Sequence, residues 1–335
     1  MVIQRLTEHI KCFYPQRNFV QGGFDMKRLI STKGMDIATW LSYRRMGVCG
    51  SDTGIILGLN PYRSVIELWE DKIGQLPIEE NENNFTHFGH LLEPIVRQEF
   101  QRQTGLKVSV RNAIFQSEQY PWMLADIDGI VTEEDGTKAI FEAKTAIEYK
   151  KGIWDEGKIP DSYFSQLQHY MAVTGLDKSY IACLVGGNSF FYYKVLRDDS
   201  YICWLIEKEK EFWNHVQTLT MPEVDASQAT VRYLNEAYAD GTDETIILPD
   251  EASDIAQKYL TVDEKIKILS KEKDLLSNQL KVMLKDHEAG FAGEYKIVWK
   301  AMTRTTVDTD KLKEKLGDSY AEYTKESRFR RLSVA

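Results

Sequence analysis

Two apolar-rich runs in the middle of the chain carry charged side chains that a purely structural β-hairpin would not need. Residues 123–131 and 138–146 flank an acidic turn containing Asp135-Gly136, a dipeptide typical of hairpin turns. Most strand positions favour Val, Ile or Thr. The charged residues inside the two runs are Asp126, Asp128, Glu142 and Lys144. Their types and spacing therefore suggest chemistry as well as structure.

The spacing predicts which of these side chains meet. If the turn is centred on Asp135, then Asp128 lies opposite Glu142. The same register places Asp126 opposite Lys144. Because side chains alternate between the two faces with period two, Glu142 and Lys144 share one face and Asp128 joins them. A shift of one residue would separate the set, so the prediction requires a loop with an odd number of residues.

Two carboxylates beside an ammonium group are compatible with metal-assisted hydrolysis. Neighbouring carboxylates repel each other unless a cation lies between them, and hard divalent ions such as Mg²⁺ prefer oxygen ligands. A lysine beside the metal can orient or deprotonate a nucleophilic water, or neutralise charge on a phosphate. The alternative is a solvated hairpin face with one ion pair, and the hairpin alone does not decide between the two.

Length and composition indicate a globular chain. Its 335 residues have room for one large domain with an appendage or for two modest domains. Hydrophobic residues at 43% and aromatic residues at 11% suffice for a packed core. No run approaches the roughly 20 apolar residues that span a bilayer, and no charged-apolar leader opens the chain. We therefore expect a soluble, cytoplasmic protein without a membrane partner.

Cysteine spacing and net charge exclude some classes of site. The four cysteines lie far apart, without a CxxC pair or a Cys/His cluster. They are expected to be reduced thiols, which argues against zinc and iron–sulfur centres. The net charge of −9 argues against a nucleic-acid binder, although a local basic groove can contact phosphates while acidic residues occupy outer faces.

A Gly/Ser-containing loop is the second candidate for a binding site. A helix is predicted from residue 36 to Arg45, followed by a loop over 46–52 and an apolar helix over 53–59. Ser51 or Asp52 would cap this second helix. Ser51, the helix amides and Arg45 would together form an anion pocket. An ordinary capped helix preceded by a surface arginine explains the segment equally well.

Two further helices carry polar residues beside apolar ones. In the helix predicted over 88–103, Glu93 lies next to an apolar stripe and could face a cleft, or form a surface pair with Arg97. The stripe consists of Phe88, Leu91, Leu92, Ile95, Val96 and Phe100. The helix predicted over 161–174 carries Gln168, and its Gln166 and Tyr170 share a face, where core hydrogen bonds are the alternative to a functional role.

The order of predicted elements indicates an α/β fold. A strand over 106–116, the hairpin, a helix, two strands over 179–187 and 189–196, and a helix over 199–218 predict a mixed sheet covered by helices. Composition changes after residue 222, where apolar residues spaced by three and four, apart from one gap of seven across Lys273, mark a long charged helix from 255 to about 290. We expect this helix to lie across the core or against a neighbouring subunit. A strand follows at 294–301. We therefore divide the chain into an N-terminal segment of unknown role (1–35), a core (36–220) and an extension (221–335).

Four motifs occur in one order along these elements, and together they resemble a known family. They are Arg45-Met46-Gly47 with Gly50-Ser51-Asp52; Gly89-x-x-x-Glu93; Asp128-Gly129 followed by Glu142-Ala143-Lys144; and Tyr163-x-x-Gln166-x-Gln168. Over residues 36–215 the chain resembles phage-type nucleases of the lambda exonuclease / YqaJ-like viral recombinase family, within the PD-(D/E)xK superfamily. The resemblance implies a restriction-endonuclease-like core with a mixed central β-sheet flanked by helices.

The resemblance also implies roles for individual residues. Asp128 and Glu142 would ligate Mg²⁺, for which Mn²⁺ would substitute, together with the Ala143 carbonyl. Glu93 would complete the metal shell, and Lys144 would activate or position the water. The remaining implied residues are Gln166, which would orient the nucleophile or Lys144, and Arg45, Ser51 and Arg63, which would bind a terminal 5′-phosphate.

One residue departs from the pattern of the family. Where relatives commonly carry a small residue and Pro before the Asp-Gly, this chain has Asp126-Ile127. The extra carboxylate would bind a second ion, or pair with Lys144 and weaken catalysis.

The implied activity is a metal-dependent exonuclease that degrades linear double-stranded DNA 5′→3′ and leaves 3′ single strands for recombination. Its partners would be duplex DNA ends, a single-strand annealing recombinase and further copies of itself, for example in a trimer. It would act in a bacterial host or phage-infected cell. Two alternatives remain open: a structure- or sequence-selective endonuclease of the same fold, and a non-catalytic module that binds DNA ends.

Overall fold

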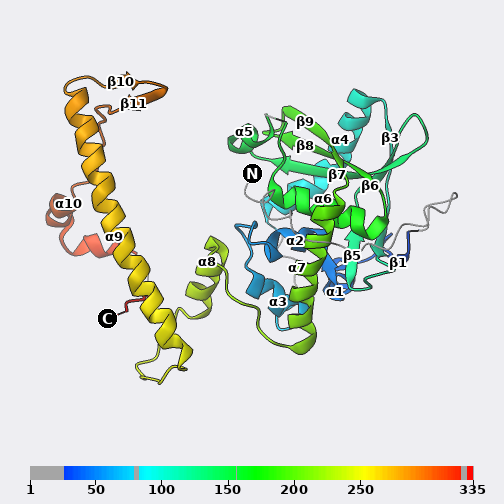
Figure 1. The fold of residues 1–335 in the computed structure, drawn as a ribbon, viewed down its shortest axis with the longest axis horizontal. Helices are drawn as coiled ribbons and strands as arrows, with labels where there is room; N and C mark the ends of the chain where they lie inside the picture. Colours follow the sequence, from blue (N-terminus) through cyan, green and yellow to red (C-terminus); the bar gives the residue numbers. More distant parts are fainter. Residues whose placement is uncertain (1–25, 79–82, 156, 326–329, 335) are drawn as a thin grey trace. The chain divides into compact units, whose positions relative to one another are not determined.

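The computed structural model describes residues 26–78, 83–155, 157–325 and 330–334 (Figure 1). Residues 1–25, most of the N-terminal segment without a predicted role, lie outside the described residues. The chain divides into two compact units, Met1–Leu234 and Asn235–Ala335. Each unit is described separately.

A five-stranded mixed sheet forms the centre of the first unit. Its order is β3 (Lys107–Ser109), β6 (Gly129–Thr132), β7 (Lys138–Ala146), β8 (Lys178–Val185) and β9 (Ser189–Leu196). The β7–β8 pair is parallel and the other three pairs are antiparallel. The parallel pair requires a crossover, which contains the short α5 (Lys151–Trp154) and the longer α6 (Asp161–Thr174). The predicted mixed α/β core is therefore confirmed.

Helices cover both faces of this sheet, and the alternation of β7 decides which side chains meet which helix. Phe141 packs in one cluster with Val96 and Phe100 of α4 (Asn84–Thr104). Ile140 packs in the cluster that contains Leu167 of α6. The α7 helix (Asp199–Thr218) lies against α6. Because side chains alternate along a strand, Glu142 and Lys144 point to the α6 side, as Ile140 does.

A second, four-stranded sheet lies beside the first. Its order is β1 (Arg28–Ser31), β4 (Ala113–Gln116), β5 (Met123–Asp126) and β2 (Val48–Cys49). The single strand predicted over 106–116 is therefore wrong, because β3 and β4 belong to different sheets. Exposed residues 110–112 separate them, and the chain passes from one sheet to the other at this point.

The hairpin has the predicted register but is shorter than predicted. Gly129 pairs with Phe141 and Thr132 with Lys138, so the loop is the five-residue segment 133–137 and has odd length. Gly136 adopts φ +83° in this turn, a conformation that favours glycine. Asp126 belongs to β5 and pairs with Ile114 of the other sheet. The prediction that Asp126 faces Lys144 is wrong, because the chain changes sheets between β5 and β6.

Among the residues that the structure describes, three helices precede α4, and the second begins differently from the sequence prediction. They are α1 (Ile37–Arg45), capped by Asp36, α2 (Gly50–Ile56) and α3 (Val65–Lys72), capped by Ser64. The N-cap position of α2 is Cys49, so neither Ser51 nor Asp52 is the N-cap residue, but Asp52 contributes to the capping box from the third helical position. The Asp52 carboxylate accepts a hydrogen bond from the Cys49 backbone at 2.8 Å.

Only the C-terminal half of α4 packs on the sheet. Val96 and Phe100 are fully buried, whereas Phe88, Leu91 and Ile95 are exposed. The predicted continuous buried stripe is therefore wrong for these three residues. The reason is that the helix is longer than its contact with the sheet. It packs on β7 and β8, and its first turns border a cleft.

The second unit contains a long helix and a small hairpin. The helix α9 spans Glu251–Leu284, β10 (Ala289–Ala292) pairs with β11 (Tyr295–Val298), and α10 spans Thr309–Leu316. The predicted long helix and last strand are present, and β10 was not predicted. The helix α8 (Gln228–Ala237) begins in the first unit and includes the first residues of the second. No helix in the described part of the chain is both long and apolar enough to cross a membrane.

The cysteines follow the sequence expectation only in part. Cys49 and Cys183 are buried free thiols, as expected. Cys203 is disulfide-bonded, which departs from the expectation of reduced thiols. Cys12 lies outside the described residues.

Candidate active site

A cleft of about 580 Å³ opens where the N-terminal turns of α4 approach β7 and α6. It gathers side chains from elements that are far apart in the sequence. The residues that the sequence nominated and that line this cleft are Ser51, Glu93, Asp126, Asp128, Glu142, Ala143, Lys144, Gln166 and Tyr170. The predicted convergence of the hairpin, the Glu93 helix and the Gln166 helix is therefore observed.

Hydrogen bonds fix the side chains at the centre of the cleft. Lys144 Nζ lies 2.6 Å from Glu142 Oε1, and Gln166 Nε2 donates to the same oxygen at 2.8 Å. The Gln166 amide also donates to the Tyr170 hydroxyl at 2.9 Å. Asp128 Oδ2 accepts the backbone N–H of Ala143 at 2.7 Å. One carboxylate oxygen of Glu142 is thus held from two sides.

The two hairpin carboxylates resist ionisation. Burial raises the pKa of Asp128 well above its ordinary value, and the nearby charges of Glu142 and Glu93 add to the rise. Burial also raises the pKa of Glu142, although Lys144 opposes this effect. A bound cation would relieve the mutual repulsion, because an opposite charge favours the ionised form of a carboxyl group.

Lys144 is held in its charged form. Burial lowers the pKa of this lysine, but Glu142 and the neighbouring Tyr163 and Asp128 outweigh burial, so the net shift is upward. Its Nζ also lies 4.9 Å from the centre of the Tyr163 ring, a cation–π distance. A protonated lysine donates hydrogen bonds and cannot accept a proton. The geometry therefore favours positioning and charge neutralisation by Lys144 over proton abstraction.

The carboxylates of the cleft fit a Mg²⁺ ion that takes only a few of its ligands from the protein. The second oxygen of Glu142, Oε2, is buried and has no hydrogen-bond partner, which is costly for a carboxylate unless a cation binds it. No group of three or more His, Cys, Asp or Glu side chains in the described ranges forms a ready-made metal cage. Mg²⁺ does not require one, since it typically binds one or two carboxylates and keeps water or substrate phosphate as its other ligands.

Glu93 forms the predicted pair with Arg97 and also faces the cleft, so both interpretations of this residue from the sequence hold. It pairs with Arg97 one turn later, with Arg97 Nη1 3.2 Å from Glu93 Oε1. It also lines the cleft and contributes to the raised pKa of Asp128. Because an i,i+4 ion pair on a helix is worth only about 0.3–0.5 kcal/mol, the pair with Arg97 leaves Glu93 able to turn toward a cation.

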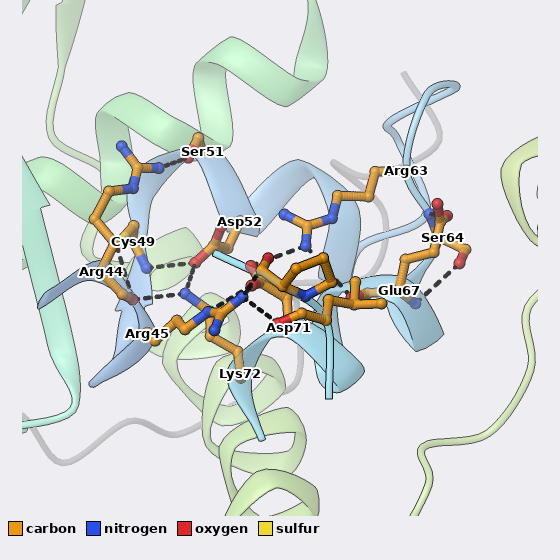
Figure 2. A network of polar contacts seen from close by, with 12 residues as sticks. Arg44, Arg45, Cys49, Ser51, Asp52, Arg63, Ser64, Glu67, Asp71 and Lys72 are labelled. Carbon is orange, nitrogen blue, oxygen red and sulfur yellow. Dashed lines mark hydrogen bonds and ion pairs between the residues drawn. The ribbon is translucent and has the colours of Figure 1, made fainter. Parts of the chain in front are cut away.

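The two adjacent arginines have different partners, as Figure 2 shows. Arg44 donates to the hydroxyl of Ser51 at 2.5 Å and lines the cleft. Arg45 and Arg63 both pair with Asp71, at 2.7 and 2.8 Å. Arg45 also donates to the carbonyls of residues 76 and 77. The arginine that the structure places beside Ser51 in the cleft is therefore Arg44, and neither Arg45 nor Arg63 is among the lining residues.

A buried ion pair positions the Arg44 segment. Lys72 Nζ lies 2.7 Å from Asp52 Oδ2, with both side chains almost completely buried. The same ammonium donates to the backbone carbonyl of Arg44 at 2.8 Å. Asp52 in turn accepts from the Cys49 backbone. These contacts connect α3, α2 and the end of α1. They hold in place the backbone from which the Arg44 side chain projects (Figure 2).

Trp40 binds the carboxylate of Asp126. The sequence did not identify this tryptophan as a site residue. Its indole Nε1 donates to Asp126 Oδ2 at 2.6 Å, and the Arg44 guanidinium lies 4.4 Å from its ring centre. Trp40 and Arg44 are one turn apart on α1 and share a face. That i,i+4 spacing was the signal in the sequence that could have favoured Arg44 over Arg45.

Gln168 has a structural role on the far side of α6. Its Nε2 donates to the Leu196 carbonyl, and its Oε1 accepts the Asp198 backbone N–H, each at 2.9 Å. The side chain is fully buried and is not among the residues that line the cleft. Gln166 and Gln168 thus point in different directions, as their spacing of two residues requires on a helix.

His169 and Glu209 form a fully buried pair that fastens α6. His169 Nδ1 lies 2.7 Å from Glu209 Oε1, and Nε2 lies 2.9 Å from the Leu124 carbonyl oxygen. Burial lowers the pKa of His169, but Glu209 and the Leu124 carbonyl outweigh it and the net pKa is raised. Burial raises the pKa of Glu209 as well. Both shifts favour retention of a proton within the pair.

This pair predicts a dependence of stability on pH. The stabilisation should be complete below the unfolded histidine pKa of about 6.5 and should be lost as the pH rises through the raised pKa of the folded state. His169→Gln should lower the free energy of unfolding by about 1–3 kcal/mol at pH 6, with a smaller difference from wild type under alkaline conditions. Urea unfolding at a series of pH values measures both quantities. The exposed His287→Gln serves as a control, and an H169Q curve parallel to that of the wild type would contradict the prediction.

Comparisons with known proteins show the family of the chain. The family model of the YqaJ-like viral recombinase domain matches residues 39–177. The uncharacterized protein YqaJ of Bacillus subtilis (strain 168) is 40% identical over 299 residues, covering 88% of this chain and 93% of the relative. The matched family segment contains all of the cleft-lining carboxylates named above.

Solved structures of exonucleases are more distant. An alkaline exonuclease (LHK-Exo) from Laribacter hongkongensis is 20% identical with a TM-score of 0.45, covering 54% of this chain and 93% of the other. A phage related exonuclease from Haemophilus somnus 129PT is 16% identical with a TM-score of 0.36, covering 53% and 95%.

The fold and the site together define the class of structure: a mixed α/β core with a cleft lined by carboxylates. The extent and identity of the match to the Bacillus relative add the family: the chain belongs to the YqaJ-like viral recombinase family.

Proposed function

We propose that this protein is a Mg²⁺-dependent exonuclease that degrades linear double-stranded DNA 5′→3′ and leaves 3′ single strands for recombination. Membership of a viral recombinase family supports a role on DNA. The observation that carries the proposal is the arrangement of Asp128, Glu142 and Lys144 within one cleft, with Glu142 Oε2 buried and unpaired. A single-strand annealing recombinase is the proposed user of the product.

The metal would be held by Asp128, Glu142, the Ala143 carbonyl and Glu93. When bound, Mg²⁺ lowers the pKa of a coordinated water and polarises the scissile phosphate. Mn²⁺ offers the same charge and oxygen preference and should replace it. A divalent cation would also offset the four carboxylates of the cleft, Glu93, Asp126, Asp128 and Glu142, which would otherwise repel a DNA phosphate.

The protein side chains would position the reacting groups. Lys144, held as a cation beside Glu142, would donate a hydrogen bond to the attacking water or to a phosphate oxygen. Charge that develops on the phosphate in the transition state is stabilised by such preorganised donors. Gln166 would hold the Glu142 carboxylate in place through its 2.8 Å hydrogen bond, and Tyr170 orients the amide of Gln166.

Arg44 and Ser51 would supply the preference for a DNA end. A guanidinium binds phosphate through two parallel hydrogen bonds, and Ser51 adds a hydroxyl at 2.5 Å from Arg44. Because both residues line the same cleft as Glu142, a terminal 5′-phosphate bound by them would place the first phosphodiester bonds near the carboxylates. The Asp126 carboxylate would form one boundary of this pocket, because its hydrogen bond from Trp40 holds it nearby.

The proposal is tested with duplex DNA labelled at one end. In the presence of Mg²⁺ or Mn²⁺, linear DNA should release nucleotides from its 5′ ends, and closed circular DNA should stay intact. Cleavage of the closed circle would instead identify an endonuclease of the same fold. If linear DNA is bound but not degraded at any protein concentration, the protein is a non-catalytic module that binds DNA ends.

A further inference from the structure

Asp126 brings a carboxylate into the pocket that is proposed to bind a terminal phosphate. It comes from β5, whereas Arg44 comes from α1 and Ser51 from α2, and all three line the same cleft. Proteins bind phosphate with cations and hydrogen-bond donors. A carboxylate in the same pocket has the opposite effect, because it repels a phosphate.

Trp40 holds the Asp126 carboxylate and the Arg44 guanidinium at the same time. Its indole Nε1 donates to Asp126 Oδ2 at 2.6 Å, and the guanidinium lies 4.4 Å from the centre of its ring. The cation therefore lies over the face of the indole and the anion lies at its edge. Because one rigid ring contacts both groups, the carboxylate stays close to the guanidinium.

The charges of Asp126 and Arg44 interact, yet the guanidinium remains available to a ligand. Burial raises the pKa of Asp126, whereas Arg44 and the hydrogen bond from Trp40 oppose the rise. Arg44 donates to the Ser51 hydroxyl and has further N–H donors. A phosphate bound by Arg44 would therefore also meet the field of the Asp126 carboxylate.

We propose that Asp126 weakens the binding of a terminal 5′-phosphate in this pocket and so limits the preference for phosphorylated ends, an inference that rests on the proposed function. A phosphate monoester carries a charge of about −1.5 to −2 and is repelled by a carboxylate held nearby, whereas a 5′-hydroxyl carries no charge. The preference that Arg44 and Ser51 supply is kept but reduced. Weaker binding also helps a product nucleotide, which bears its own 5′-phosphate, to leave the cleft.

The first test measures kcat/KM for Asp126→Asn on two duplexes that differ only in the 5′-phosphate. Asparagine keeps the shape of the side chain and an oxygen that can accept the Trp40 N–H. Under mildly alkaline conditions, where Asp126 is ionised in the wild type, the ratio of phosphorylated to hydroxyl ends should rise at least about tenfold, because nearby charges interact strongly at a partly buried site. Asp135→Asn, in the exposed turn of the hairpin, removes the same charge outside the cleft and should leave the ratio unchanged.

Two results of this experiment would overturn the proposal. One is a ratio in D126N that equals or falls below that of the wild type. The other is an equal loss of cleavage on both duplexes together with a lower affinity for Mn²⁺, which would make Asp126 a metal ligand instead.

The second test measures binding without cleavage. Calorimetry with the full-length protein and Mg²⁺ compares deoxyadenosine 5′-monophosphate with deoxyadenosine. D126N should bind the monophosphate about tenfold more tightly than the wild type does, with the affinity for deoxyadenosine unchanged. Equal affinities for the monophosphate, or no binding of it by either protein, would overturn the role of Asp126.

This measurement also separates the inference from the proposed function, because neither probe is cleaved. Tighter binding by D126N in a protein that degrades no DNA would retain the role of Asp126 and exclude the exonuclease. Equal binding in a protein that does degrade DNA would have the reverse meaning.

Discussion

Replacing Lys144 by alanine is expected to lower the rate of DNA cleavage by about a hundred- to a thousand-fold, the usual cost of removing one preorganised charge-stabilising donor from a transition state. The variant should still fold, because Lys144 is partly exposed and its loss leaves Glu142 bonded to Gln166. Lys107→Ala, on the edge strand of the same sheet, is the matched control and should cleave at the wild-type rate. The measurement is the initial rate of nucleotide release from linear duplex DNA with saturating Mg²⁺.

Glu142→Gln should reduce cleavage to a similar extent by a different route. The amide keeps the shape of the side chain but removes the negative charge that would bind a cation. Affinity for Mn²⁺, measured by calorimetry, should fall together with activity, whereas Lys144→Ala should change activity without abolishing metal binding. Glu134→Gln, in the exposed turn of the same hairpin, controls for the loss of one carboxylate. Wild-type cleavage by both Lys144→Ala and Glu142→Gln would exclude this cleft as the catalytic site.

Arg44→Ala is expected to lower the degradation of 5′-phosphorylated DNA by about ten- to a hundred-fold, since a hydrogen bond to a charged group contributes about 1.5–3 kcal/mol. Degradation from 5′-hydroxyl ends should change much less, because those ends lack the phosphate that Arg44 would bind. The rates are compared on two substrates that differ only in the terminal phosphate.

The adjacent arginine is the matched control for this prediction. Arg45→Ala removes the same charge one residue later, but it breaks the pair with Asp71 and should affect both substrates alike, through a loss of stability. If Arg45→Ala is the variant that discriminates between the two kinds of end, the assignment of the pocket to Arg44 is wrong. Arg44→Lys should recover only part of the activity, because lysine cannot bind phosphate through two parallel hydrogen bonds.

The local pattern of the chain determined much of the framework. The helix predicted over 161–174 and the helix predicted over 199–218 have those bounds in the structure. The register of the β6–β7 hairpin, and with it the meeting of Asp128, Glu142 and Lys144, also followed from the sequence. Helical periodicity, strand alternation and turn length act over a few residues, so the identities of neighbouring side chains suffice to fix them.

The sequence could not determine which face of an element would become a wall of the cleft. Arg44 and Arg45 are adjacent and chemically identical, and only the docking of α1 against α2 and α3 turns one toward Ser51 and the other toward Asp71. The apolar stripe of α4 could not reveal that Phe88 and Leu91 lie beyond the edge of the sheet.

Asp126 shows the same limit most directly. Its distance from Lys144 along the hairpin suggested a cross-strand pair, yet the chain leaves one sheet for the other just after this residue. Its carboxylate therefore meets Trp40, which lies 86 residues earlier. The sequence by itself determined which residues share a strand or a helix face, because those relations are local. Only the tertiary structure decided which faces meet across the cleft, because that depends on long-range packing that no short segment encodes.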